Sequence, residues 1–143
     1  MRRTAVIALL FCSLFACAQL DKIMIQAGTP EDQALQAISN EPDAQKKLAM
    51  YEDFVQKFSV NPAAVAYGNW QISQFYQTSG DLEKALRYGD KALASAPGNL
   101  DILVSQTNLA QQVKSNVKIM DYATRGGKTY NSVAQQPKPA DVT

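Results

Sequence analysis

Apolar residues recur at helical spacing through most of this chain. Intervals of three and four residues place side chains on one face of an α-helix. Two such stripes are clear, formed by Leu48, Tyr51, Val55 and Phe58 and, later, by Leu82, Leu86 and Leu93. No segment sustains the alternation of apolar and polar residues that is typical of a strand. The pattern therefore predicts an all-α protein.

Residues typical of helix starts divide this region into six predicted helices. Side chains of Asn, Asp, Ser and Thr cap a helix by accepting hydrogen bonds from its first turn, and proline fits into that turn. Such starts occur at Thr29-Pro30, Asp43, Asn61-Pro62, Gly80-Asp81, Asn99 and Ser115-Asn116. The turns between them are short, so consecutive helices should pack as antiparallel neighbours.

One helix pair has the length and the packing residues of a known repeat. Residues 66–99 measure 34 residues and contain a helix, a tight turn, a second helix and a turn marked by Pro97. Ile72-Ser73 and Tyr76 on the first helix, and Ala85 on the second, stand at positions of its pattern. This stretch resembles a tetratricopeptide repeat. The resemblance implies a short α-solenoid, in which stacked helix pairs bury each other's apolar faces.

The same resemblance implies about three antiparallel helix pairs. Residues 29–62 form a degenerate pair, residues 63–99 the best-matching unit, and residues 100–133 a degenerate or capping pair. Residues 19–28 are predicted to be a short tether or a first apolar contact. Residues 134–143 contain two prolines and no apolar period, and are predicted to be a flexible tail.

Some positions depart from the repeat pattern. Gln106 and Thr107 stand where the family has an apolar residue and a glycine. Gly89 replaces an aromatic residue of the second helix in the central unit. A glycine there leaves room for a ring from a neighbouring unit, either Tyr51 or Tyr122.

A glycine pair, Gly126-Gly127, lies inside the last predicted helix, at a cost of up to about 1 kcal/mol per glycine relative to alanine. Either this helix ends near Arg125, or the unit is a frayed terminal cap with a polar outer face. The pair also begins the sequence GGKT, which is similar to the end of a phosphate-binding loop. That loop needs a glycine where Tyr122 stands and a preceding strand. We therefore interpret GGKT as the turn at a helix end.

Residues 1–18 have the pattern of an export signal. Two arginines precede an uncharged run over residues 5–16, which is shorter than the roughly 20 apolar residues of a membrane-spanning helix. Cleavage after Ala18 would leave Gln19 first. Alternatively, the sequence LFAC ending at Cys17 resembles the lipobox of bacterial lipoproteins, in which the cysteine becomes residue one and carries lipid. We favour lipid attachment at Cys17, which predicts a protein of the bacterial cell envelope, periplasmic or anchored to the outer membrane.

Composition favours binding over catalysis. The chain has no histidine, which removes the Ser-His-Asp and Cys-His arrangements and the commonest zinc ligand. Its net charge is +1, and becomes −1 if Arg2 and Arg3 leave with the signal, so no basic surface indicates nucleic acid. The acidic residues stand at helix starts or on polar faces, without the spacing of a calcium loop. We expect no enzyme, cofactor, metal or small-molecule substrate.

A second stripe on the first helix of the central unit predicts a binding surface. In the tetratricopeptide family this face lines the concave groove where partner peptides lie. The stripe consists of Tyr67, Trp70, Gln74 and Gln77, and the next unit continues it with Asp101, Val104, Asn108 and Gln111. Aromatic anchors beside amides suit an extended or helical peptide. The alternative is that Trp70 packs against the preceding repeat.

Two functions are therefore expected from the sequence. The first is a scaffold or adaptor of the cell envelope that holds a partner polypeptide in its concave groove. The second is a structural component of a larger envelope assembly, which acts through stacking of solenoid ends or through oligomerisation.

Overall fold

The structure, a computed structural model, describes residues 22–135. Within this range every regular element is an α-helix, so the prediction of an all-α fold is confirmed there. The six helices are α1 (Pro30–Ser39), α2 (Ala44–Lys57), α3 (Pro62–Ser79), α4 (Leu82–Ser95), α5 (Leu100–Gln112) and α6 (Asn116–Ala134).

The helices begin where the capping residues predicted. Five of the six described helices start at a side chain that accepts a hydrogen bond from the first turn, and these residues are Thr29, Asp43, Asn61, Asp81 and Asn99. Each such cap satisfies backbone N–H groups that the helix leaves free, and contributes about 1 kcal/mol. Ser115 precedes α6 in the same way, but its side chain makes no capping hydrogen bond.

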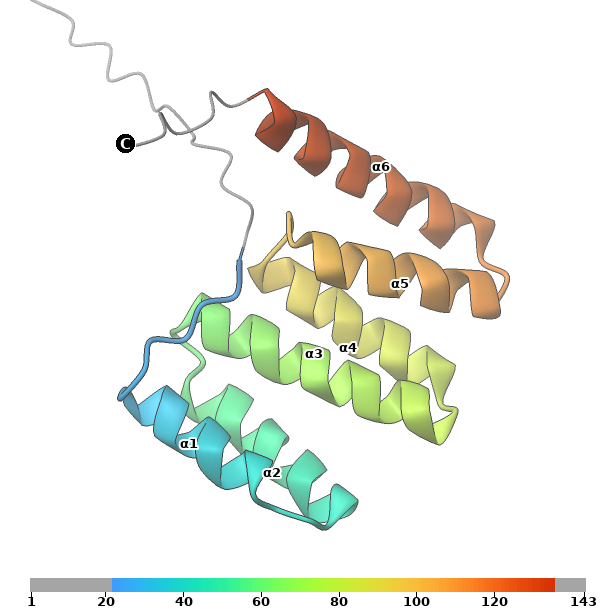
Figure 1. Ribbon diagram of the computed structural model, residues 1–143. Coiled ribbons are helices and arrows are strands. Elements are labelled where there is room, and N and C mark those ends of the chain that lie inside the picture. Colours follow the sequence, from blue (N-terminus) through green and yellow to red (C-terminus); the bar gives the residue numbers. More distant parts are fainter. Residues whose placement is uncertain (1–21, 136–143) are drawn as a thin grey trace, which may run out of the picture.

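The helices are arranged in a row in which each one packs on its neighbours in the chain. The substantial helix–helix contacts within the described residues are α1 with α2, α2 with α3, α3 with α4, α4 with α5 and α5 with α6. Figure 1 shows that successive helices run in opposite directions, so α1, α3 and α5 begin on the same side of the molecule. The row differs from a bundle closed around one central core.

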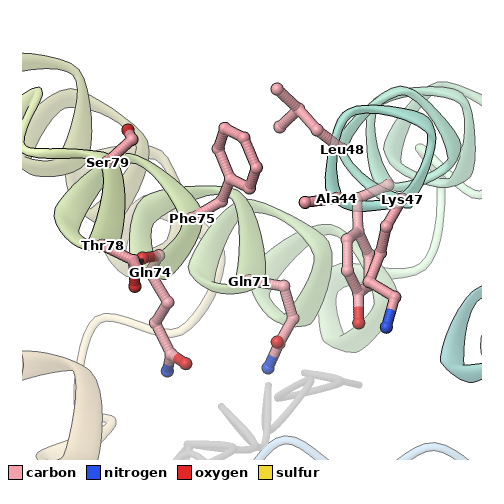
Figure 2. A pocket seen from close by; sticks show the side chains of 9 residues that line it. Ala44, Lys47, Leu48, Gln71, Gln74, Phe75, Thr78 and Ser79 are labelled. Carbon is pink, nitrogen blue, oxygen red and sulfur yellow. Dashed lines mark hydrogen bonds between the residues drawn. The ribbon is translucent and has the colours of Figure 1, made fainter. Parts of the chain in front are cut away.

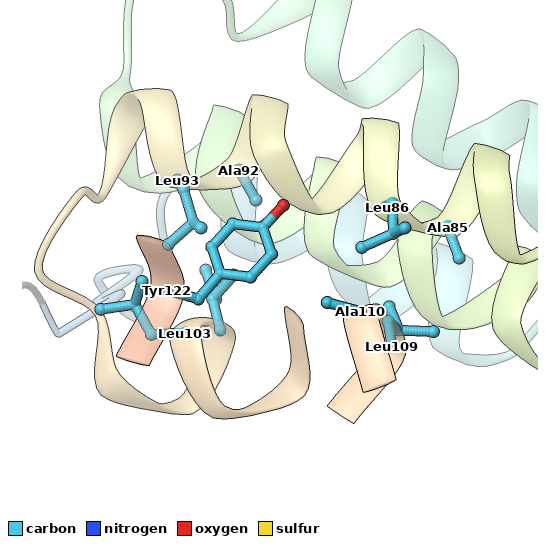
Figure 3. Close-up of a cluster of buried hydrophobic side chains, with 9 residues drawn as sticks. Ala85, Leu86, Ala92, Leu93, Leu103, Leu109, Ala110 and Tyr122 are labelled. Carbon is cyan, nitrogen blue, oxygen red and sulfur yellow. The ribbon is translucent and has the colours of Figure 1, made fainter. Parts of the chain in front are cut away.

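Two separate hydrophobic clusters lie inside this row. The larger one joins α4, α5 and α6, and Figure 3 shows the Tyr122 ring among Leu93, Leu103 and Ala92. The smaller one joins α1, α2 and the start of α3, and consists of Ile38, Phe54, Phe58 and Ala64. We call them the C-terminal cluster and the N-terminal cluster.

Small residues bring α3 and α4 together, as the repeat pattern implied. Ser73, Ala85 and Ala92 are all buried. The Ser73 hydroxyl donates a hydrogen bond of 2.6 Å to the Ala85 carbonyl oxygen on the facing helix. This bond satisfies both buried polar groups, so the two backbones can approach without leaving a donor or acceptor unpaired.

One of the two alternatives for the glycine pair, a helix that ends near Arg125, is wrong, and so is the interpretation of GGKT as a turn at a helix end. Helix α6 does not end near Arg125 but continues through Gly126-Gly127 to Ala134, and GGKT lies inside it and forms no turn. Each glycine lowers helix propensity by only about 1 kcal/mol, which weakens a helix but does not end it. Before the pair, Tyr122 is buried and the Arg125 guanidinium donates a 3.4 Å hydrogen bond to the Pro97 carbonyl oxygen. After the pair, Thr129, Ser132 and Val133 are partly buried.

The predicted signal and most of the predicted tail lie outside the residues that the structure describes. Of the predicted tail 134–143, Ala134 is the last residue of α6, and residues 136–143 lie outside the described range. Cys17 and the predicted signal 1–18 also lie outside it. Within residues 22–135 no helix has the length and apolar character needed to cross a bilayer.

Candidate protein-binding surface

The four predicted groove residues of α3 are all partly buried, and they point to different neighbours. Tyr67 faces α2. Burial, and secondly the neighbouring Tyr67 hydroxyl, raises the pKa of Tyr51 on α2 to about 12. Tyr67 therefore helps to join α2 to α3 and does not project freely from the surface.

Trp70 contacts a different neighbour from Tyr67. Its ring packs against the C-terminal cluster, which belongs to the following helices, whereas the alternative interpretation expected the preceding pair. The indole N–H of Trp70 is buried and has no acceptor among the described residues. A buried donor without a partner is costly, so Trp70 is held here by the packing of its ring and not by a hydrogen bond.

A groove of about 530 Å³ opens between α2 and α3. It is lined by Ala44, Lys47, Leu48, Tyr51, Gln71, Gln74, Phe75, Thr78 and Ser79. In Figure 2 the Gln71 and Gln74 amides point to one side, and the side chains of Phe75 and Leu48 lie on the other. The groove thus combines an apolar wall with amide groups that can donate to and accept from a peptide backbone.

Only Gln74 of the predicted stripe lines this groove. The sequence analysis missed Gln71, Phe75 and the contributions of α2. The sequence did contain a signal for this groove, because the first predicted helix is too short to cover the whole length of the third. Helix α1 has 10 residues and α3 has 18, and Figure 1 shows the second half of α3 extending beyond α1. Helix α1 does not cover this part of α3, which leaves the groove beside α2 open, while another side of the same segment packs on α4, where the Tyr76 and Tyr88 rings stack.

The predicted stripe on α5 lies at the surface. Asp101, Val104, Asn108 and Gln111 are all exposed, and Val104 keeps 61% of its side-chain surface accessible. These residues are accessible to a partner, but they do not line the groove of Gln74. The structure therefore divides the predicted site between interhelix contacts, the α2–α3 groove and the α5 surface.

A polar network at the other end of the row was not predicted. The buried Gln106 amide donates 2.9 Å to the Leu86 carbonyl oxygen. The Tyr122 hydroxyl donates 2.5 Å to an Asp90 carboxylate oxygen, and the Lys118 ammonium lies 3.0 Å from the other oxygen. Hydrogen bonding to Asp90 raises the pKa of Lys118. The pKa of Tyr122 is also raised, first by burial and then by Asp90.

This network explains Gly89. A side chain at that position would occupy the place of the Gln106 amide, so neither Tyr51 nor Tyr122 fills the space that the sequence analysis assigned to them. Gln106 is therefore a specific partner of Gly89 and of the Leu86 carbonyl, although the repeat pattern made it look like a departure. Within the described residues no group of three His, Cys, Asp or Glu side chains is arranged to hold a metal ion.

Comparison with known proteins does not assign this surface. A scan against models of protein families found no match to the chain, and searches among curated proteins and solved structures found none either.

Proposed function

We propose that this protein is a binding scaffold of the bacterial cell envelope, with a tetratricopeptide-like solenoid that holds a partner polypeptide. The observation that carries the proposal is the open groove between α2 and α3. A row of helices in which each packs on its neighbours leaves such grooves accessible, whereas a closed bundle fills them. The groove offers apolar side chains beside amides, which suits a peptide.

The proposal includes an anchor. A lipid on Cys17 would hold the helical region at a membrane surface, and no catalytic step, nucleic acid or small-molecule substrate is part of the function. Mass spectrometry of the mature N-terminus tests the anchor. We expect an acylated Cys17, and a chain that begins with unmodified Gln19 would show a free periplasmic or secreted protein instead.

Charge insertion tests the binding surface without disturbing the fold. The variant Gln74→Arg with Val104→Arg places bulky cations in the groove and on the exposed α5 stripe. Val60→Arg is the matched control, because Val60 is 94% exposed in the turn between α2 and α3. Partners captured from envelope extract are identified by mass spectrometry and rebound in purified form.

We expect the purified partner to bind the intact chain and the Val60→Arg control with the same Kd, and to bind the groove variant at least about tenfold more weakly, a loss of about 1.4 kcal/mol. Circular dichroism checks that all three proteins keep the same helicity. Equal Kd values for all three proteins would remove the groove from the proposed function.

A second candidate function is favoured by the outer face of α6. Val117, Met120 and Tyr130 are 81%, 71% and 64% exposed on this terminal helix. Exposed apolar residues on one helix are typical of a contact site, so α6 could stack on further subunits of an envelope assembly. Light scattering separates the two candidates. Defined oligomers that dissociate with Val117→Glu and Met120→Glu favour the assembly, and a monomer favours the scaffold.

A further inference from the structure

The segment that precedes α1 lies against the helices. Residues 22–28 contain no helix, and burial alternates over residues 22–26, after which residues 27 and 28 are exposed. Ile23 and Ile25 are partly buried, whereas Met24 between them is 77% exposed. Alternation with a period of two is the mark of an extended chain that docks one face on a surface. We call residues 22–28 the strap.

The strap connects the two hydrophobic clusters. Ile23 packs against the C-terminal cluster, and Ile25 packs against the N-terminal cluster. Trp70 packs against the same cluster as Ile23. In Figure 1 the strap, drawn in blue, passes along the side where α1, α3 and α5 begin. Two isoleucines separated by one residue thus span the boundary between two helix pairs.

Hydrogen bonds fix one end of the strap. The Gly28 N–H donates 2.8 Å to an Asp32 carboxylate oxygen, and the Thr29 hydroxyl donates 2.7 Å to the Gln26 carbonyl oxygen. These bonds join the strap to the first turn of α1. The part that carries Ile23 and Ile25 depends on their apolar contacts, so it can be displaced by a segment that makes the same contacts.

We propose that the strap is an internal ligand, and that it occupies a track for an extended polypeptide. The external ligand would be an extended segment with two aliphatic residues separated by one residue, because Ile23 and Ile25 show which spacing fits. This inference deepens the proposed scaffold function and rests on it. Since the strap is covalently linked, its effective concentration is high. A partner must compete with the strap. The apparent affinity of the partner is therefore its intrinsic affinity multiplied by the fraction of molecules in which the track is free.

The test uses a defined probe and the full chain. The probe is a fluorescein-labelled peptide with the sequence of residues 22–28, KIMIQAG, and its binding is measured by fluorescence polarisation. The variant Ile23→Asp with Ile25→Asp should release the strap. Met24→Asp is the matched control, because its side chain already faces solvent. We expect the released variant to bind the probe with a Kd at least about tenfold lower than that of the intact chain and of the control.

A probe in which both isoleucines are aspartate should bind none of the proteins. If the double aspartate variant loses helicity by circular dichroism, Ile23→Ala with Ile25→Ala replaces it, since alanine removes the contacts without adding charge. Helical strap variants that bind the probe no better than the intact chain would overturn the inference.

Trp70 provides an independent readout, because it is the only tryptophan of the chain. Strap release should shift its emission to longer wavelength, and probe binding should reverse the shift. The outcome also separates the two proposals. If the probe binds the released variant, the strap track is supported. If a purified partner binds the Gln74→Arg and Val104→Arg variant as tightly as the intact chain, the α2–α3 groove is excluded as its binding site. The two results are independent of each other.

Discussion

Gly89 on α4 lies directly against the Gln106 amide of α5. We expect Gly89→Ala to lower the free energy of unfolding by about 2 kcal/mol, because the new methyl group displaces a buried, hydrogen-bonded side chain. Urea denaturation measures the loss. In the double variant with Gln106→Ala the methyl group meets no obstacle, so its own effect should shrink by about 1 kcal/mol or more. Strictly additive effects would contradict this account.

Tyr51 makes the protein sensitive to alkaline pH. Its pKa is raised from the ordinary value of 10.0 to about 12, chiefly by burial. The folded state therefore keeps a proton that the unfolded state releases. Stability from this group is complete below pH 10 and is lost as the pH rises from 10 towards 12.

Thermal unfolding followed by circular dichroism at pH 9, 10 and 11 measures this effect. We expect the midpoint to fall above pH 10, and to fall less steeply in Tyr51→Phe. Lys118 and Tyr122 also have raised pKa values, so part of the alkaline loss should persist in that variant. Identical profiles for the variant and the intact chain would show that Tyr51 is not responsible.

At the scale of single residues, local sequence predicts some features and misses others. Gln74 could be placed on an accessible face because its position depends only on helical spacing. The role of Gln106 could not be predicted, because it depends on the Leu86 carbonyl and Gly89, about one helix away in the chain. A repeat pattern describes the average environment of a position, whereas a buried amide is stabilised by individual partners.

At the scale of elements, α6 has one buried residue, Tyr122, and two glycines whose Cα positions face open space. An added methyl group would meet nothing at Gly126 or Gly127. We expect Gly127→Ala to raise the free energy of unfolding by about 0.5–1 kcal/mol, since alanine loses less backbone entropy in a helix.

Gly80 is the matched control for this prediction. A methyl group also meets nothing there, but the residue ends α3 with a left-handed φ of 85°. Gly80→Ala should therefore destabilise the protein by about 1 kcal/mol. If both substitutions change stability in the same direction in urea denaturation, backbone conformation is not the deciding factor.

The helix starts were more predictable than the end of α6. Five of the six described starts depend on one side chain that accepts hydrogen bonds from its own first turn, as Asn61 does from the N–H groups of Ala63 and Ala64. The end of α6 had no such local signal, because the glycine pair lies inside the helix and does not end it. The contacts that dock α6 also come from distant parts of the chain, as the bond from Arg125 to Pro97, 28 residues earlier, shows. Glycine propensity is a weak local preference and does not fix a helix boundary.

At the scale of the whole molecule, neighbour-to-neighbour packing should give the row graded stability. Each interior helix is held from two sides, whereas α1 and α6 are each held mainly from one. Local opening in such arrays begins at the ends. Hydrogen exchange should therefore show the strongest protection in α3, α4 and α5 and the weakest in α1 and α6. Uniform protection along the chain would indicate a single cooperative core instead.

The strap has a consequence for reach if Cys17 is fixed in a membrane. With Ile23 docked, five residues lie between it and Cys17, and this span extends to about 20 Å at most. If Ile23 and Ile25 are displaced while the hydrogen bonds at Gln26 and Gly28 remain, eight residues lie between Cys17 and Gln26 and extend to about 30 Å. A partner that takes the place of Ile23 and Ile25 would thus lengthen the tether by about half, and the helices could reach farther from the lipid surface.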